Sequence, residues 1–173
     1  VTSIKRISDV MKSEGYTLAP QTVENYISAL VDSFILYPAQ RYDIKGKEYL
    51  RFGEKYYVID IGLRYLLLGK KGGDTGHILE NIVYLELLRR GYSVYIGKVN
   101  SEEVDFVAVN AKGTEYYQVA QTVRSDVTLL RELRPLENIR DHNPKFLLTL
   151  DNDPETSHNG IRQQNVLDWL SEL

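Results

Sequence analysis

The fold is indicated most directly by residues 102–121, EEVDFVAVNAKGTEYYQVAQ. This stretch predicts two β-strands joined by the tight turn NAKG. Alternate side chains of a strand share one face of the sheet. Glu103 and Asp105 therefore point the same way on the first strand, and Gln118 and Ala120 share a face on the second. Polar side chains from the two strands are expected to meet.

A helix predicted over residues 77–90 adds a third polar group, because Glu80 lies at the edge of its apolar stripe. A carboxylate there is partly desolvated unless a cation or a hydrogen-bond donor meets it. Oxygen ligands from a helix and two neighbouring strands suit Mg²⁺. We therefore predict a magnesium site at Glu80, Glu103 and Asp105, with Gln118 beside it. The alternative is that each acid is structural, through a pairing partner or a half-exposed strand edge.

The position of a catalytic lysine decides how much activity to expect. A lysine at position 120 would orient the attacking water and offset charge on the pentavalent phosphate. This chain has Ala120 there, and Gln118 offers a neutral carbonyl where a carboxylate would bind a metal more tightly. Lys98 and Lys145 are the alternative lysines, but neither lies in a motif. Cleavage is therefore expected to be weak or absent.

The whole chain predicts an α/β protein in two parts. Residues 1–69 contain two helices, the second starting at Pro20, then a hairpin, a separate short strand at 56–59 and a short helix. The two helices and the hairpin make a small winged-helix-like unit. Residues 70–173 follow the order α-β-β-β-α-β. The glycine-rich stretch 69–76 is the expected boundary.

The winged-helix-like unit supplies candidate DNA contacts. The candidates for a major groove are Gln21, Thr22 and Asn25 at the start of the second helix. The candidates for phosphate contacts are Lys45, Lys47 and Arg51 on the hairpin. Acidic neighbours weaken this surface, so contact with a protein is an equal alternative. Thirteen tyrosines suit an interface too, although strand pairing explains them as simply.

Composition limits the classes of function. The formal net charge is -3, and residues 1–69 carry 9 Lys and Arg against 8 Asp and Glu, so nucleic-acid contact needs a local patch. The absence of cysteine excludes disulfides, thiolate zinc sites and cysteine nucleophiles, and it fits the cytoplasm, where we expect this protein. No apolar run approaches the ~18–20 residues of a spanning helix, so no membrane partner is expected.

Two further features concern nucleotides and chain length. The stretch Gly69-Lys70-Lys71-Gly72-Gly73 does not have the spacing of a P-loop, so no nucleotide site is expected in this chain. The chain begins with Val1 rather than an initiator Met, and we expect it to be part of a longer protein. The three histidines show no metal-ligand spacing.

The helix with Glu80, the hairpin with Asp105 and the Gln-x-Ala strand together resemble the PD-(D/E)xK pattern of restriction-endonuclease-like and Holliday-junction-resolvase-like folds. More closely, the chain resembles the domain of unknown function that follows a P-loop AAA-type ATPase domain in bacterial and archaeal proteins. The runs that carry this likeness are Lys55–Arg64, Glu80–Leu87, Gly91-Tyr92, Glu103–Val107, Gln118–Ala120 and Arg131-Glu132.

This resemblance implies a winged-helix segment, a nuclease-like domain at 70–173 and an ATPase domain upstream as a partner in cis. It carries the metal-binding positions onto Glu80, Asp105 and Gln118. The expected function is a module that recognises nucleic acid or a partner, with a degenerate nuclease-like site for Mg²⁺. The alternatives are a Mg²⁺-dependent endonuclease or junction-resolvase-like enzyme, and a protein–protein docking module.

Overall fold

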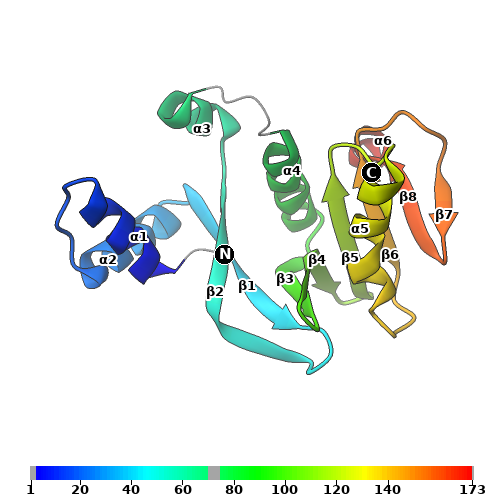
Figure 1. The fold of residues 1–173 in the computed structure, drawn as a ribbon, viewed down its shortest axis with the longest axis horizontal. Helices are drawn as coiled ribbons and strands as arrows, with labels where there is room; N and C mark the ends of the chain where they lie inside the picture. The colour runs from blue at the N-terminus through cyan, green and yellow to red at the C-terminus, as the bar shows by residue number, and fades with distance from the viewer. Residues whose placement is uncertain (1–2, 70–74, 173) are drawn as a thin grey trace.

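The computed structural model describes residues 3–69 and 75–172, and within them one mixed sheet of eight strands runs through the molecule (Figure 1). The strands are β1 (Leu36–Asp43), β2 (Glu48–Val58), β3 (Ser93–Val99), β4 (Glu102–Asn110), β5 (Gly113–Ala120), β6 (Lys145–Thr149), β7 (Thr156–His158) and β8 (Ile161–Asn165). Their order across the sheet is β2-β1-β3-β4-β5-β6-β8-β7.

Helices cover both faces of this sheet. The helices of the described residues are α1 (Ile4–Ser13), α2 (Pro20–Asp32), α3 (Ile61–Leu68), α4 (Thr75–Arg89), α5 (Asp126–Glu137) and α6 (Val166–Ser171). Side chains of α4 and α6 share one hydrophobic core with one face, and α5 packs into a second core on the other. The helices α1 and α2 lie at the far end of the molecule from α5 and α6 (Figure 1). Across the described residues, no helix is both long and apolar enough to cross a bilayer.

Local signals in the first part act as predicted. The Ser3 side chain accepts a hydrogen bond from the Arg6 N–H at 3.2 Å and caps α1, and Pro20 is the first residue of α2. The separate strand predicted at 56–59 is wrong, because Tyr56–Val58 is the end of the long strand β2. The β1–β2 ladder continues past a register shift between Ala39 and Arg41, so the hairpin is longer than its pattern indicated.

The hairpin also joins the rest of the sheet. β1 pairs in parallel with β3, with Arg41 opposite Ile96, so strands from residues 1–69 and from residues 70–173 share one sheet. The expected boundary and the Gly69–Gly73 stretch fall mostly on residues 70–74, outside the described residues. One strand was not predicted: β7 pairs with β8, and the turn between them holds Gly160 at a φ of 86°.

The strands β4 and β5 separate at one end, and this fork positions the site. Their ladder starts at the pair Phe106–Tyr117. The first residues of β4 pair with β3 instead, and the last residues of β5 pair with β6. Between the pairs Tyr95–Val107 and Gly97–Val104, β4 has one residue more than β3, which makes a bulge at Asp105-Phe106. Such a bulge bends a strand and redirects its side chains.

Gly97 allows β3 to pack closely beside this bulge. A Cβ at position 97 would lie 2.9 Å from Val104 Cβ, 2.9 Å from Val107 Cγ2 and 3.0 Å from Ile44 Cδ1. Gly97→Ala is therefore expected to lower the free energy of unfolding by about 1–3 kcal/mol in urea titrations, through overpacking. The matched control is Gly76→Ala on α4, where a Cβ meets nothing within 4 Å. Equal stability of the two variants would contradict this packing.

Candidate functional site

One cavity opens at the fork, and three of the predicted site residues line it: Glu80, Asp105 and Gln118. Its volume is about 470 Å³. Its walls come from the start of α4, the end of β5 and the first half of α5. Residues far apart in the sequence therefore meet where two strands separate, at the carboxyl end of β5.

The side chains of Asp105 and Gln118 accept hydrogen bonds from backbone N–H groups at the fork. The Asp105 N–H donates to Gln118 Oε1 at 3.3 Å, and the Val119 N–H donates to Asp105 Oδ2 at 2.8 Å. These contacts replace ladder hydrogen bonds that the separated strands cannot form with each other. Both side chains consequently have a structural role as well as a place in the cavity.

The sequence did not predict that the lysine nearest these acids is Lys55 of β2, which lines an adjoining pocket that shares Glu80 with the fork cavity. Its Nζ lies 3.1 Å from Glu80 Oε1 and 2.7 Å from Glu103 Oε1. The Tyr57 hydroxyl donates to the same Glu80 oxygen at 2.6 Å. Burial lowers the pKa of Lys55, but the charges of Glu80 and Glu103 outweigh it and raise the pKa to about 12. Lys55 is therefore an ammonium ion among the acids.

Asn81 fixes the helix that carries Glu80 against β2. Its side-chain amide donates to the Val58 carbonyl at 2.8 Å, and its oxygen accepts the Val58 N–H at 2.9 Å. Asn81 is buried and so pairs with the strand edge as another strand would. Glu80 directly precedes Asn81 in α4, so this contact places Glu80 beside Lys55 and Tyr57.

Glu103 faces the N-terminal strands. Its Oε2 lies 3.1 Å from an Arg41 nitrogen, while its Oε1 contacts Lys55. Two cations thus hold the carboxylate that was predicted to be a third metal ligand. Glu103 is not among the side chains that line the fork cavity.

The positions considered for the catalytic lysine lie elsewhere. Ala120 lines the cavity with a side chain that also packs into the apolar core under α5. Lys98 stands opposite Glu103 in the β3–β4 ladder, and Lys145 donates to the Asp141 carbonyl at 2.9 Å. Neither of these lysines lines the cavity.

A further acid, Glu132 of α5, completes the cavity. This residue lies in the run Arg131-Glu132 that carries the family resemblance, but the sequence predicted no role for it in the site. Its Oε2 accepts a hydrogen bond from Gln118 Nε2 at 2.9 Å, and its Oε1 pairs with Arg131 at 2.7 Å. Burial, reinforced by Glu80 and more weakly by Glu132, raises the pKa of Asp105 to about 8, against the opposing effect of Lys55. At neutral pH Asp105 is therefore mostly protonated, while Glu80 and Glu132 are paired with Lys55 and Arg131.

The residues at the fork fit a divalent cation by their chemistry. Glu80, Asp105, Glu132 and the Gln118 amide supply the oxygen donors that Mg²⁺ prefers. The pKa of Asp105 is raised by burial first and by the charge of Glu80 second, and a bound cation would offset both effects. Within residues 3–69 and 75–172, however, no group of three or more acidic or histidine side chains is arranged so that it could hold a metal ion. Glu80 is turned toward Lys55 and Tyr57, so an ion would have to draw it back.

The structure separates the two groups of candidate DNA contacts. Gln21 and Asn25 are exposed on α2 and Thr22 is half-buried, while the Gln21 amide donates to Glu24 at 3.3 Å. Lys45 and Lys47 are exposed in the β1–β2 turn, roughly 25 Å along β1 from α2 at ~3.3 Å a residue. Arg51 lies on β2, and its side chain is outside the described residues.

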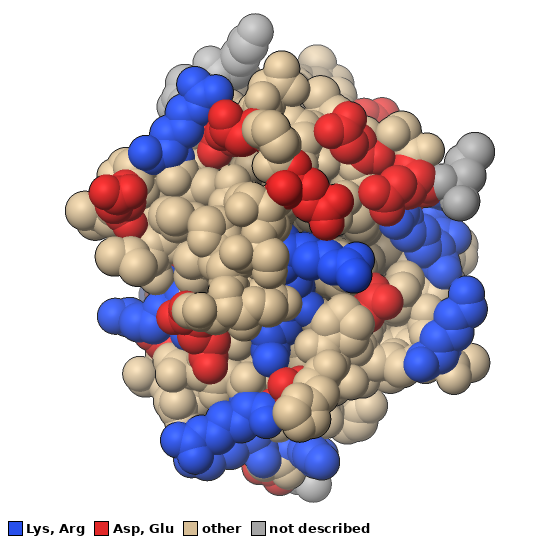
Figure 2. Space-filling view, turned by 90° about the vertical axis from the view of Figure 1, so that its right-hand side faces the viewer, with Lys and Arg blue, Asp and Glu red and all other residues tan. Residues whose placement is uncertain are grey.

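Charge is mixed on the surface. In the face shown in Figure 2, acidic side chains gather toward the top and basic ones lie across the middle and the bottom. This face offers no single broad basic surface, in keeping with the formal net charge of -3. Any phosphate contact there must be local.

The pKa of Asp105 gives a pH-dependent stability. In the folded state it is raised to about 8, from ~3.9 in an unfolded chain. The folded state thus binds more protons between these values, and stability falls as the pH rises from about 4 to about 8. We expect wild type to lose on the order of a few kcal/mol relative to Asp105→Asn over this range.

Urea titrations of both proteins between pH 5 and pH 9 measure this difference. The asparagine keeps an oxygen for the Val119 N–H, so the comparison isolates the proton. Parallel pH profiles for the two proteins would contradict the buried, acid-flanked carboxyl.

Comparison with known proteins gives relatives without an assigned activity. Residues 2–74 match a family model described as Domain of unknown function (DUF8612). The chain is 41% identical over 165 residues to an uncharacterized protein of Haemophilus influenzae, covering 95% of this chain and 40% of that protein. It is 30% identical over 155 residues to the uncharacterized protein MJ1544 of Methanocaldococcus jannaschii, covering 87% of this chain and 32% of that protein.

The chain therefore spans well under half the length of these two relatives, one bacterial and one archaeal. No solved structure matches the chain.

Proposed function

We propose that this chain is the nucleic-acid-recognition module of a longer protein, and that the cavity at the fork receives a phosphate group together with a divalent cation. The observation that carries the proposal is the gathering of Glu80, Asp105 and Gln118 around one cavity from three separate elements, with Lys55 of a fourth element bound to Glu80 from an adjoining pocket. Acids and a lysine at separated strands are the parts of a phosphodiester site.

The finer assignment of the fold belongs to this proposal. The order α4-β3-β4-β5-α5-β6 supports a restriction-endonuclease-like core, with β3, β4 and β5 antiparallel and β6 parallel to β5. The helices α1 and α2 followed by the β1–β2 hairpin support a winged-helix-like unit. An AAA-type ATPase domain upstream in the longer protein completes the proposal and rests on the resemblance alone.

Recognition rather than efficient cleavage is supported by how the polar groups are occupied. Gln118 is neutral, its oxygen accepts the Asp105 N–H and its amide donates to Glu132. Lys55 is held by two carboxylates, so its charge is already balanced by Glu80 and Glu103. Glu80 and Asp105 would hold Mg²⁺, whose charge would offset that of the phosphate. Arg131 in the fork cavity and Lys55 in the adjoining pocket would contribute positive charge near the phosphate.

A second candidate function is a Mg²⁺-dependent phosphodiesterase, and the position of Lys55 favours it. A catalytic lysine need not stand at position 120 if another strand brings one to the same acids. Release of Lys55 from Glu80 would leave its ammonium beside Asp105, whose charge already acts on it. Asp105 has a pKa of about 8, so it would accept a proton from an attacking water only in its ionised form, which predominates above that pH.

Helix α3 of this chain has exposed apolar side chains to which the remainder of the longer protein could bind. Leu66 and Leu67 of α3 are 81% and 73% exposed, side by side in one helix. Adjacent exposed leucines are typical of contacts with another protein surface. We assign this helix to the contact with the remainder of the longer protein.

Fluorescence anisotropy with a labelled 20-base-pair DNA duplex and a four-way junction tests the proposed function. Wild type is expected to bind, more weakly as KCl rises and more strongly with Mn²⁺ or Mg²⁺. Asp105→Asn should lose the metal-dependent part, whereas Asp168→Asn, an exposed change on α6, should not. Absence of binding, or binding that ignores salt and metal, would refute the proposal.

A gel assay of the same DNA with Mg²⁺ separates the two candidates. Cleavage that disappears in both Asp105→Asn and Lys55→Met would establish the phosphodiesterase and overturn recognition without cutting. Cleavage that survives both changes would point to a contaminating nuclease.

A further inference from the structure

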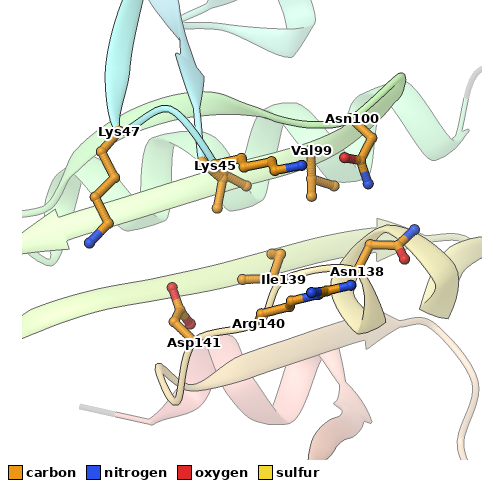
Figure 3. A pocket seen from close by; sticks show the side chains of 9 residues that line it. Lys45, Lys47, Val99, Asn100, Asn138, Ile139, Arg140 and Asp141 are labelled. Carbon is orange, nitrogen blue, oxygen red and sulfur yellow. The ribbon is translucent and has the colours of Figure 1, made fainter.

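A second pocket opens where three segments meet near the end of α5 (Figure 3). Its volume is about 330 Å³. The β1–β2 turn supplies Lys45 and Lys47, the β3–β4 turn supplies Asn100, and the segment that follows α5 supplies Arg140. Residues of the β1–β2 turn and residues that follow β3 and α5 thus line one pocket. The sequence did not predict that these segments meet.

Positive charge dominates this pocket. Lys45 and Arg140 lie on opposite walls in Figure 3. The described residues include no ion pair for Lys45, Lys47 or Arg140. The one acid on the wall, Asp141, already accepts hydrogen bonds from the Tyr116 hydroxyl at 2.6 Å and from the Asn143 N–H at 3.1 Å. Three cations around a hollow attract an anion.

The backbone holds these side chains in place. Asp43 Oδ1 accepts the N–H groups of Lys45 at 3.0 Å and Gly46 at 2.9 Å, which closes the β1–β2 turn. Lys47 and Asn100 both have left-handed backbone, with φ values of 54° and 55°. Such a conformation is unfavourable for a side chain other than glycine and persists where the surroundings fix it. The cations therefore extend from a preset turn.

We propose that this pocket binds a phosphate group of a nucleic-acid strand whose neighbouring stretch lies at the fork. The inference rests on the proposed function and adds a second contact to it. Lys and Arg are the usual phosphate ligands. The amide of Asn100 on the wall could donate a hydrogen bond to a phosphate or sugar oxygen, and so could the second N–H of Asn138, whose amide already donates to Glu102 at 2.7 Å.

The position of the pocket sets the length of strand that joins the two sites. Thr128 and Glu132 line the fork cavity, and Asn138 lines the second pocket. At ~1.5 Å per helical residue the separation along α5 is roughly 9–15 Å, which is about three or four nucleotides at ~3.4 Å each. Arg131 lines the fork cavity and Arg134 lies between the two sites, with side chains 69% and 68% exposed, although they are paired with Glu132 and Glu102.

Salt-dependent DNA binding tests this contact in the full chain. Anisotropy of the 20-base-pair duplex between 50 and 300 mM KCl compares wild type with Arg140→Gln and with Lys45→Gln/Lys47→Gln. The slope of log affinity against log salt should fall by about one for the arginine and about two for the lysine pair. The matched controls, Arg162→Gln and Lys112→Gln, change exposed residues of β8 and the β4–β5 turn and should keep the wild-type slope.

Inorganic phosphate serves as a second probe, followed by amide shifts in ¹H–¹⁵N NMR spectra. Phosphate should shift amides at 45–47, 100 and 138–141 in wild type and not in the variants. Shifts together with reduced DNA slopes support a nucleic-acid phosphate. Shifts without any DNA binding by wild type would overturn the nucleic-acid source and the proposed function, and would leave a free-phosphate site.

Unchanged slopes in the pocket variants, with a metal-dependent component that Asp105→Asn still removes, would overturn the pocket alone. Absence of both phosphate shifts and slope changes would do the same. All replaced side chains are exposed, so melting temperatures should stay at the wild-type value.

Discussion

Replacing Glu80 with alanine is expected to lower the free energy of unfolding by about 3 kcal/mol. The change leaves the Tyr57 hydroxyl without its acceptor and Lys55 with only one of its two carboxylates. Glu80 is 13% exposed and Lys55 is 23% exposed, so water replaces these contacts poorly. Losing one member of a buried pair is strongly destabilising because the other charge stays behind. Urea titration at pH 7 measures the loss.

Two further variants isolate the cause. Glu80→Gln keeps an acceptor for Tyr57 and should lose about half as much stability. Adding Lys55→Met to Glu80→Ala removes the stranded charge and should recover part of the loss. Glu24→Ala, an exposed change on α2, should stay within about 0.5 kcal/mol of wild type. If Glu80→Ala were as stable as Glu24→Ala, the Lys55–Glu80–Tyr57 cluster would not exist in solution.

The affinity for Mn²⁺ is expected to rise about ninefold between pH 6 and pH 7 and about fivefold between pH 7 and pH 8, about fiftyfold in all. The ion needs an ionised Asp105, and the pKa of this group is raised to about 8 by burial and by Glu80. Binding must therefore displace one proton below that pH, and the dependence should level off above it. Calorimetric titration in two buffers of different ionisation enthalpy counts the proton directly.

Two variants with opposite expected effects on the Mn²⁺ affinity make this test specific. Asp105→Asn should bind Mn²⁺ weakly and without the pH dependence. Lys55→Met should bind it more tightly than wild type, because the lysine competes with the ion for Glu80. Equal weakening by both changes would mean that the ion does not enter the fork.

Most elements follow from signals local in the sequence. Ser3 caps α1, Pro20 begins α2, and the apolar stripe around Glu80 predicts α4, because each signal depends on residues a few positions away. The meeting of Glu80, Asp105 and Gln118 at one cavity follows from the order of elements and the period of two in strands. Those three positions were also the ones that the family resemblance supplied.

The lysine of the site was missed because its partners are distant in the chain. Lys55 lies 25 residues before Glu80, on a strand whose extent depends on a bulge and on pairing with β1. A usable signal was present: Lys55 and Tyr57 are two residues apart, and therefore share one strand face. The fork itself depends on where the β4–β5 ladder ends, which no local pattern determines.

Anomalous diffraction from crystals soaked in Mn²⁺ would show whether a cation enters the fork cavity. We expect one strong peak there, bound by carboxylate oxygens of Glu80 and Asp105, with Lys55 moved away from Glu80. A cavity without a peak, in which Lys55 still bridges Glu80 and Glu103 at high Mn²⁺, would contradict a cation-assisted phosphate site and leave the cluster as a structural ion network.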